Sequence, residues 1–556
     1  MERNVANDLA DVLKNCGMDK FFLLTGGDQA LWIALHDNNI QMVVAHSEAS
    51  AVYMADGFAR ASGKPVITYG QAGPGAANVA AALADAYWAQ SPVVALTGAT
   101  DSTLRHAHEY QAIEQFSMFD PVTIWNARAE HQGSAATLLR QAIQKSVAAT
   151  PGPTHVDIPK NFFAKPSQGR IPPALPLPAR IPVGGGDPAV ARAMVEALLK
   201  AKSPVILVGE GVRMAAAWDE LAELASAAGI PVAATVGGKA AVAASHPNFV
   251  GIVGRYSSVK ANDIMEKADV VLALGTRLGG LATKGYSLPR RSAKILQIDH
   301  DASAFANPYF PELCQNADLV PALRELTALF RDAGPASTTW LEQCRSAVRT
   351  WYAALNAATE DAPEANGVSP LAVLAELEPY AGDITVVADT GYMAAWTSVL
   401  YPLARPDSYF RAAGSLGWAL PAALGVQMAR PEKVVCVTGD GGACYHLSDI
   451  ETAARFGLPV TILILNNSCL AFEYHEQKYR WNGRVVEEAN NFSHVDYAAA
   501  AEALGARGRT AESRSDVAKL LAEAMAHDGP TVIDIVTDRE AYPPVTNFEA
   551  AMERAL

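Results

Sequence analysis

The sequence predicts an α/β protein of three doubly wound domains, each built on a parallel sheet. Short β-branched runs recur along the chain, each ends near Gly or Asp, and a helical pattern follows each run. Continuous apolar strands that alternate with helices are typical of parallel sheets that are buried on both faces. The 556-residue length corresponds to roughly three or four domains of ordinary size.

The predicted strands fall in three groups along the chain. Residues 166–186 contain six prolines and four glycines, and residues 357–368 are acidic and rich in helix breakers. Both stretches are typical of linkers, so the predicted domains are residues 1–165, 187–335 and 363–556. The first and third blocks share a strand–helix cadence. The clearest predicted strands are Val66–Thr68, Val93–Leu96, Val205–Val208, Val270–Leu274, Ile295–Ile298, Thr385–Ala388, Val434–Val437, Thr461–Leu465 and Val532–Val536.

Composition narrows the class of protein. The formal charge is −14 and no Lys/Arg run occurs, so we expect no nucleic-acid partner. The first residues form an amphipathic helical pattern that contains acids, unlike a signal or transit peptide. The apolar runs are too short and interrupted to span a membrane. The six cysteines form no CxxC pair, which is typical of a reduced, cytoplasmic protein.

A glycine-rich turn in the third block has the composition of a phosphate and metal site. The strand Val434–Val437 leads into Gly439-Asp440-Gly441-Gly442, and a second strand ends in Asn466-Asn467. Glycines at a strand end leave backbone amides open to a phosphate. A carboxylate and an amide oxygen are hard ligands that suit Mg²⁺. Glycine-rich turns after strands are also common in ordinary folds, so the motif is weak by itself.

This motif resembles the cofactor signature of thiamine-diphosphate-dependent enzymes. The resemblance extends over nearly the whole chain and implies three domains, which in order bind the pyrimidine, form the centre and bind the diphosphate. It implies Mg²⁺ ligands at Asp440, Asn467 and the Cys469 carbonyl. The cofactor-binding residues that it implies are Glu48, Gly391, Gly414, Leu416, Gly439, Asp440, Gly441, Gly442, Asn467 and Ser468.

Glu48 follows an apolar run and opens a helical pattern in the first block. An acid at a helix N-terminus is often only a partner of the helix dipole. The segment resembles the glutamate helix of the same family, however, which implies that Glu48 bonds N1′ of the aminopyrimidine and promotes loss of the thiazolium C2 proton.

The segment FRAAGSLGWALP in the third block supplies two further residues. By resemblance, Leu416 forces the cofactor into its V-shape and the Gly414 carbonyl accepts from the 4′-amino group. Leucine is found here in benzoylformate decarboxylase-like members. The alternative is an ordinary turn before a core helix. Because the pyrimidine and diphosphate domains of this family meet across subunits, we expect a homodimer or homotetramer.

The residues beside the expected thiazolium favour carboligation. Decarboxylases often use histidines there, whereas this chain has Gly26-Gly27 and Gln71; His106 and His108 lie in a loop and are expected to be solvated. Tyr110-Gln111 resembles a Phe-Gln pair of acetolactate synthase. Arg277 resembles that enzyme's acceptor-binding arginine, a role that suits a guanidinium.

Three residues depart from acetolactate synthase, two of them in the expected acceptor pocket and the third, Met393, near the expected diphosphate. Glu476 replaces a tryptophan, Arg255 a methionine and Met393 a histidine. An acidic and a basic residue in an otherwise apolar pocket indicate a polar or unusual acceptor.

The central block has the pattern of a nucleotide-binding sheet. Asp299 ends a strand, where acids often bind ribose hydroxyls, although a plain strand cap explains it equally well. This domain holds FAD in acetolactate synthases and ADP in oxalyl-CoA decarboxylases. GIVGRYSS (residues 251–258) replaces the methionine-rich loop that contacts FAD, so FAD is possible and not required.

The function that we expect is a thiamine-diphosphate- and Mg²⁺-dependent carboligase. It would decarboxylate a 2-oxo acid such as pyruvate and add the resulting enamine to a second carbonyl compound. Glu48 would activate the cofactor, Gln71 and Gln111 would orient substrate, and Arg277 would hold a carboxylate. The alternatives are a 2-oxo acid decarboxylase, a 2-hydroxyacyl-CoA lyase, or a non-catalytic cofactor-binding subunit; the intact Glu48, Asp440 and Asn467 argue against the last.

Overall fold

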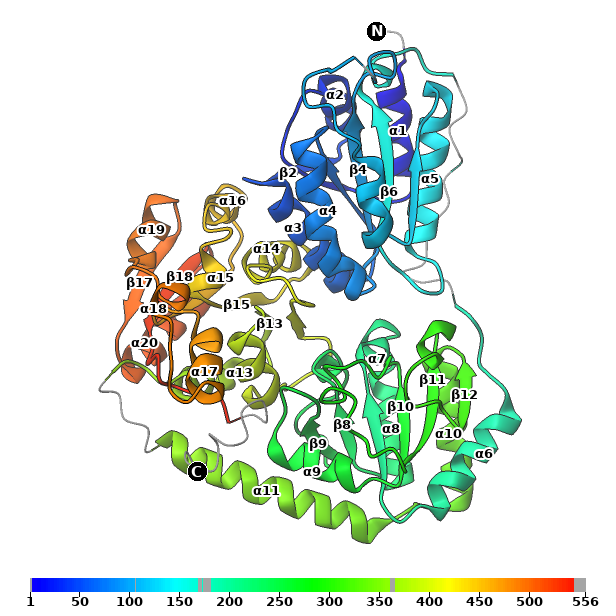
Figure 1. Cartoon of the computed structure of the whole chain (residues 1–556), viewed down its shortest axis with the longest axis vertical. Helices are drawn as coiled ribbons and strands as arrows, with labels where there is room; N and C mark the ends of the chain where they lie inside the picture. Colours follow the sequence, from blue (N-terminus) through cyan, green and yellow to red (C-terminus); the bar gives the residue numbers. More distant parts are fainter. Residues whose placement is uncertain (1–2, 106, 169–172, 174–181, 361–365, 545–556) are drawn as a thin grey trace.

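The chain folds into three parallel sheets, each with helices on both faces (Figure 1). The computed structural model describes residues 3–105, 107–168, 173, 182–360 and 366–544, and omits the side chains of 358–360. His106 and most of the linker expected at 166–186 lie outside the described residues. Each sheet has six strands, and all pairings between the named strands are parallel. The predicted fold class is confirmed.

The first sheet has the strand order β2-β1-β3-β4-β6-β5. It begins after α1, the amphipathic helix expected at the start of the chain. Its strands are β1 (Lys20–Leu23), β2 (Gln41–Val44), β3 (Val66–Gly70), β4 (Val93–Ala99), β5 (Trp125–Arg128) and β6 (Thr154–Pro159). Its helices are α1 (Val5–Asn15), α2 (Gln29–Asp37), α3 (Glu48–Ser62), α4 (Pro74–Trp88) and α5 (Ala135–Ser146), with short 3₁₀ turns η1 (Phe116–Val122), η2 (Gln132–Ser134) and η3 (Lys160–Phe162).

The central sheet has the order β12-β11-β10-β7-β8-β9. Its strands are β7 (Pro204–Val208), β8 (Val232–Ala234), β9 (Phe249–Ile252), β10 (Val270–Leu274), β11 (Lys294–Asp299) and β12 (Leu313–Asn316). Its helices are α6 (Pro188–Lys200), α7 (Glu210–Met214), α8 (Trp218–Ala228), α9 (Val259–Lys267) and α10 (Leu319–Ala333), with η4 (Lys239–Ala241) and η5 (Ala302–Phe305).

The third sheet, β14-β13-β15-β16-β18-β17, repeats the strand order of the first. Its strands are β13 (Ile384–Ala388), β14 (Tyr409–Arg411), β15 (Lys433–Gly439), β16 (Thr461–Asn466), β17 (Arg507–Ala511) and β18 (Thr531–Val536). Its helices are α12 (Pro370–Leu377), α13 (Tyr392–Leu400), α14 (Ala419–Ala429), α15 (Asp440–Ala443), α16 (Asp449–Arg455), α17 (Ala471–Arg480), α18 (Glu487–Asn490), α19 (Tyr497–Ala503) and α20 (Arg514–Met525), with η6 (Glu378–Tyr380).

A long helix, α11 (Thr338–Glu360), connects the central and third domains along the outside of the molecule (Figure 1). It takes up residues 357–360 of the stretch expected to be a linker, because alanine and polar helix formers precede the first breaker, Pro363. Within the described part of the chain, no helix combines the length and the apolar character that crossing a membrane requires.

The first and third domains meet through α3 and α14, which cross at two glycines. A Cβ atom on Gly57 would lie 2.3 Å from the Ala422 carbonyl oxygen, and one on Gly425 would lie 1.9 Å from the Met54 carbonyl oxygen. Side chains at these positions would therefore force the helices apart. Gly57 faces Ala422, and the earlier Met54 faces the later Gly425. The two helices are therefore antiparallel.

Candidate active site

Asp440 lies where β15 ends and α15 begins, in the glycine-rich turn that the sequence singled out. Its carboxylate accepts hydrogen bonds from three backbone amides: Gly441 (2.7 Å), Asn467 (3.2 Å) and Cys469 (3.1 Å). The adjacent strands β15 and β16 thus bring together Asp440 and Asn467, which are 27 residues apart in sequence.

The turn after β16 presents two further oxygen atoms beside Asp440. Ser468 has the left-handed φ of 54°, which bends the backbone so that the Asn467 side-chain oxygen accepts from the Cys469 amide at 3.1 Å. The Cys469 carbonyl accepts from the Ala471 amide at 2.9 Å. One lone pair of that carbonyl is left for another partner.

This donor set fits a divalent cation of the Mg²⁺ type. Asp440 is only 4% exposed, and among the described residues no Lys, Arg or His forms an ion pair with it. Burial raises the pKa of Asp440 to about 6, although hydrogen bonds from backbone amides oppose the shift. A bound cation would offset the cost of burying this charge, and carboxylate, amide and carbonyl oxygens are the ligands that Mg²⁺ prefers.

The glycines around this turn make close backbone approaches. A Cβ on Gly442 would lie 2.5 Å from Asp389 Oδ2, and one on Gly441 would lie 2.7 Å from a Leu470 methyl. Gly439 faces open space, with only one atom at 4.0 Å, and Gly391 has a φ of 67° at the start of α13. Gly439 and Gly391 therefore leave room for a ligand next to the turn.

Glu48 is the first residue of α3 and is half-buried at the N-termini of α3 and α4. Its Oε2 accepts a hydrogen bond of 3.0 Å from the Asn78 side chain. A Cβ atom on Gly75 would lie only 2.9 Å from Glu48 Oε1, so the glycine lets the α4 backbone approach this carboxylate closely. Asn78 was not singled out from the sequence; its one signal is a poor helix former placed inside a helix.

Gln71 and Gln111 lie beside each other. Gln71 Nε2 donates to Gln111 Oε1 at 3.2 Å, and a Cβ on Gly26 would lie 2.5 Å from Gln71 Oε1. Gln111 has a φ of 61° and follows Tyr110, whose side chain is 80% exposed. Within the described part of the chain, no histidine hydrogen-bonds to either glutamine.

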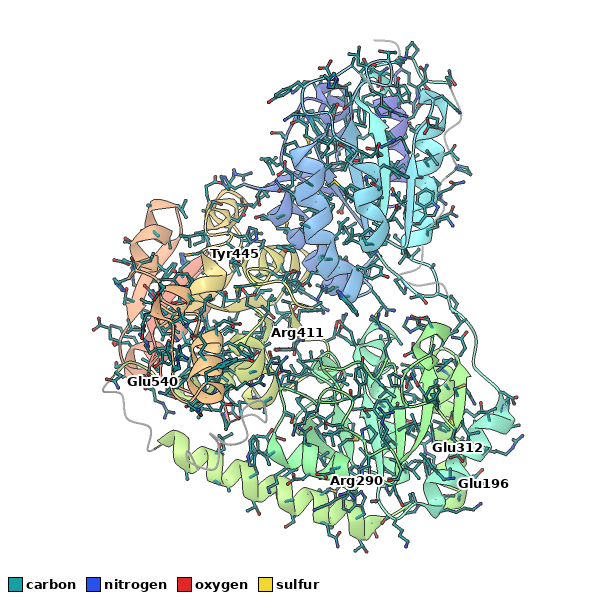
Figure 2. The ribbon with its side chains drawn as sticks, in the orientation of Figure 1. Glu196, Arg290, Glu312, Arg411, Tyr445 and Glu540 are labelled. Atoms are coloured by element: carbon teal, nitrogen blue, oxygen red, sulfur yellow. The ribbon has the colours of Figure 1, made fainter. Side chains whose placement is uncertain are left out.

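Carboxylates from two domains hold the Gly414–Leu416 loop and the residue after it: Asp85 accepts from the Gly414 amide, and Asp389 accepts from the Gly417 amide. Gly414 itself is exposed, and a Cβ there would have no atom within 4 Å. Arg411, which precedes the loop, faces the central domain (Figure 2). Neither aspartate was identified as a site residue from the sequence, because each acts on residues far along the chain.

Arg277 lies apart from the glutamine pair within one chain. It donates to the Trp88 carbonyl at 3.0 Å and lines a cavity of about 140 Å³ at the strand ends of the central sheet, together with Asp299. No hydrogen bond or ion pair among the described residues links it to Gln71 or Gln111.

Glu476, one of the residues that the sequence placed in the acceptor pocket, is paired within its own helix. Glu476 forms an ion pair of 2.8 Å with Arg480 one helical turn away. His475 beside it is fully buried and bonds the Tyr392 hydroxyl at 2.9 Å. Burial lowers the pKa of His475 to about 4, so this imidazole is neutral near pH 7.

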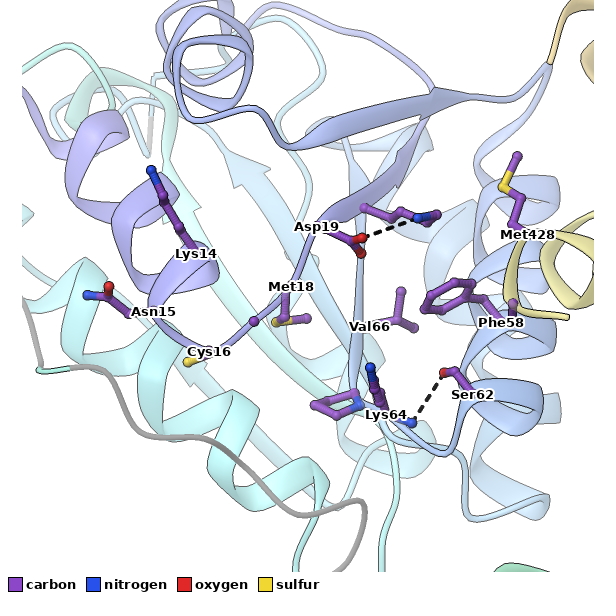
Figure 3. A pocket seen from close by; sticks show the side chains of 14 residues that line it. Lys14, Asn15, Cys16, Met18, Asp19, Phe58, Ser62, Lys64, Val66 and Met428 are labelled. Atoms are coloured by element: carbon purple, nitrogen blue, oxygen red, sulfur yellow. Dashed lines mark hydrogen bonds and ion pairs between the residues drawn. The ribbon is translucent and has the colours of Figure 1, made fainter. Parts of the chain in front are cut away.

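A larger cavity lies where β1 and β3 begin, at the N-terminal ends of these strands of the first sheet. It has a volume of about 570 Å³ and is lined by Lys14, Cys16, Lys64 and Met428, among others (Figure 3). None of the expected site residues lines it.

The three sheets define a three-domain α/β protein whose first and third domains share one topology and carry polar side chains at their strand ends. The chain belongs to the thiamine pyrophosphate enzyme family. Residues 3–118 match the N-terminal thiamine pyrophosphate-binding domain, residues 191–326 the central domain and residues 389–535 the C-terminal thiamine pyrophosphate-binding domain.

Relatives with several names align over most of the chain. A probable acetolactate synthase large subunit of Methanocaldococcus jannaschii is 29% identical and covers 92% of this chain and 88% of its own. A sulfoacetaldehyde acetyltransferase of Alcaligenes xylosoxydans is 30% identical, with 91% and 88% covered. The solved structure of a thiamine diphosphate-dependent 4-hydroxybenzoylformate decarboxylase of Rhodococcus jostii superposes with a TM-score of 0.82 at 22% identity, over 97% of this chain and 100% of that chain. This last likeness shows the fold alone.

Proposed function

We propose that this protein is a thiamine-diphosphate- and Mg²⁺-dependent carboligase that transfers the unit left by decarboxylation of a 2-oxo acid to a second carbonyl compound. When bound, thiamine diphosphate supplies the electron sink for loss of CO₂. The observation that carries the choice of reaction is the Gln71–Gln111 pair. Amides orient a substrate but do not readily donate a proton, so protonation to a free aldehyde is disfavoured relative to attack on a second carbonyl.

The cofactor-binding roles follow from the contacts described above. Asp440, Asn467 and the Cys469 carbonyl hold Mg²⁺, and the amides of the turn bind the diphosphate. With the cofactor bound, Glu48 would hold a proton toward N1′ of the aminopyrimidine, and Asn78, which donates to Glu48 Oε2, would keep the carboxylate oriented. The Gly414 carbonyl and the Leu416 side chain would contact the aminopyrimidine half of the cofactor from the third domain.

The placement of Glu48 supports an active site shared between two chains. Arg60, near the C-terminal end of α3, hydrogen-bonds the Arg411 carbonyl beside the Gly414 loop. Glu48 opens the same helix twelve residues earlier, which is about 18 Å along the helix axis. Among the described residues, α3 contacts the Gly414 loop through Tyr53 and Arg60, five and twelve residues after Glu48, and no hydrogen bond joins Glu48 itself to this loop. A homodimer in which a second chain supplies Glu48 satisfies both contacts.

We also propose that the acceptor is polar. Arg255 is exposed, and its guanidinium is a group suited to bind the carboxylate or sulfonate of a substrate, whereas Glu476 pairs with Arg480 within its own helix. The sulfoacetaldehyde acetyltransferase relative, at 30% identity, favours a negatively charged acceptor over an apolar one.

The central domain is the place where FAD would bind. The cavity beside Asp299 measures about 140 Å³, below the roughly 300–1,000 Å³ of pockets for larger ligands, so one chain alone encloses part of a nucleotide at most. A visible absorption spectrum of the purified protein tests FAD directly.

Product analysis tests the reaction. Pyruvate is supplied with Mg²⁺ and thiamine diphosphate, alone and with sulfoacetaldehyde, an uncharged aldehyde or a second 2-oxo acid. We expect a coupled product, formed best with a charged acceptor. Free acetaldehyde as the sole product under every condition would refute carboligation and favour the decarboxylase alternative.

We also propose a cytoplasmic location, because the six free cysteines favour a reducing compartment.

A further inference from the structure

The loop that carries Gly414 is bound by a single aspartate of the first domain. Asp85 lies near the end of α4 and is 2% exposed. Its Oδ1 accepts from the Ala413 amide at 2.9 Å, and its Oδ2 accepts from the Gly414 amide at 3.0 Å and the Ser415 amide at 2.8 Å. Three successive amides that converge on one carboxylate fix the path of the backbone at this point.

Arg60 completes the environment of Asp85. It donates to Asp85 Oδ1 at 2.8 Å and also pairs with Asp56, whose other partner is the Trp418 indole at 2.8 Å. Burial alone would raise the pKa of Asp85, but Arg60 and the three backbone amides outweigh burial and lower the pKa. The side chain is therefore an anion that accepts four hydrogen bonds, the full capacity of a carboxylate.

The opposite side of the same loop is open. Gly414 is exposed, and among the described residues no donor bonds the Gly414 carbonyl. Asp85 thus holds the amide side of the loop, and the carbonyl that the proposed function assigns to the cofactor is left pointing away from this anchor.

We propose that Asp85 is a positioning residue that holds the Gly414–Leu416 loop in the form that receives the aminopyrimidine half of the cofactor. The inference rests on the proposed function. It assigns to the first domain two separate tasks: Glu48 serves the cofactor bound by the partner chain, and Asp85 shapes the loop for the cofactor bound by its own chain.

The variant Asp85→Asn tests this role with little change in shape. If the remaining oxygen keeps its bonds to Arg60 and the Ala413 amide, the new NH₂ group meets the Gly414 and Ser415 amides, and donors face donors. A matched control is Asp269→Asn in the central domain, where one carboxylate accepts from the Lys202 and Ser203 amides at 2.8 and 2.9 Å.

The readout is calorimetric titration of the apoprotein with two probes, each in the presence of Mg²⁺. Thiamine diphosphate occupies the whole site, and inorganic diphosphate occupies only the metal end. For Asp85→Asn we expect binding of thiamine diphosphate to weaken by about tenfold or more, while binding of inorganic diphosphate changes less than twofold. Asp269→Asn should bind both probes as the unchanged protein does.

Hydrogen exchange of the unchanged apoprotein provides a second measurement, which holds even if the variant fails to fold. Peptides that cover residues 413–415 should be protected, because the three amides are bonded to a buried anion. Rapid exchange there, or equal loss of both probes in Asp85→Asn, would overturn the role of Asp85. Failure of the unchanged protein to bind thiamine diphosphate would instead refute the proposed function.

Discussion

Asn78 controls the direction in which the Glu48 carboxylate faces. Its amide donates to Glu48 Oε2 at 3.0 Å, which leaves Oε1 for the ligand. We predict that Asn78→Ala lowers kcat by about 10–100-fold, since a hydrogen bond to a charged group is lost, while inorganic diphosphate still binds. Steady-state kinetics and calorimetry check this. Asn38→Ala, which removes a bond to the Ala34 carbonyl in α2, is the control. Unchanged kcat in Asn78→Ala would contradict the assigned role.

Lys239 gives a pH-dependent contribution to stability. It is 4% exposed and donates to the Ser398 and Tyr401 carbonyls at the end of α13. Burial lowers its pKa to about 7. Between pH 7 and about 10 the unfolded chain binds the extra proton, so the contribution of Lys239 to stability rises with pH.

Urea unfolding at pH 7, 8 and 9 measures this effect. The unchanged protein should gain stability relative to Lys239→Met as pH rises, by up to about 1.4 kcal/mol per pH unit. The exposed Lys200→Met should give curves parallel to those of the unchanged protein. Parallel curves for Lys239→Met as well would show that the pKa of Lys239 is ordinary.

At the scale of elements, the crossing of α3 and α14 depends on the absence of side chains. We predict that Gly57→Ala lowers the free energy of unfolding by about 1–3 kcal/mol through overpacking, although alanine favours a helix by about 1 kcal/mol over glycine. Thermal unfolding checks this. Gly382→Ala, where a Cβ meets nothing within 4 Å, should be neutral. A stabilised Gly57→Ala would mean that the helices can separate without cost.

The strands identified from the sequence were predictable because each is a largely apolar, β-branched run that the structure buries. Val270–Leu274 and Thr461–Leu465, for example, are strands β10 and β16, and all their residues are buried. Edge strands such as β5 (WNAR) and β12 (LCQN) lack such a run, are only partly buried and were not predicted.

The helix α11 was not predicted, because its last residues, 357–360, fall in a stretch whose acids and breakers are typical of a linker. Its buried Leu341, Trp351 and Leu355 do recur at helical spacing. The contacts of Asp85 were not predictable either, since it bonds residues 328–330 positions away. Local patterns carry no information about such partners.

The site was predictable where the chemistry is local. Asp440 and Asn467 end neighbouring strands, and the structure places them in hydrogen-bond contact. Asn78 instead contacts Glu48, 30 residues earlier, and only the folded protein brings these two side chains together.

For the whole molecule, the central claim is that each active site takes Glu48 from one chain and Asp440 from another. Mixing two inactive variants tests it. Glu48→Gln should abolish turnover because the cofactor is no longer activated, and Asp440→Ala should abolish Mg²⁺ binding. In a dimer with one copy of each variant, one site combines both defects and the other site is intact.

The decisive measurement is the activity recovered after the two variants are unfolded together and refolded, or co-expressed, in equal amounts. With random pairing half of the dimers are mixed, and each has one intact site of two, so we predict about a quarter of the activity of the unchanged protein. Each variant refolded alone should be inactive. If mixed chains form dimers and recover no activity, the two residues do not meet across subunits and the account is contradicted.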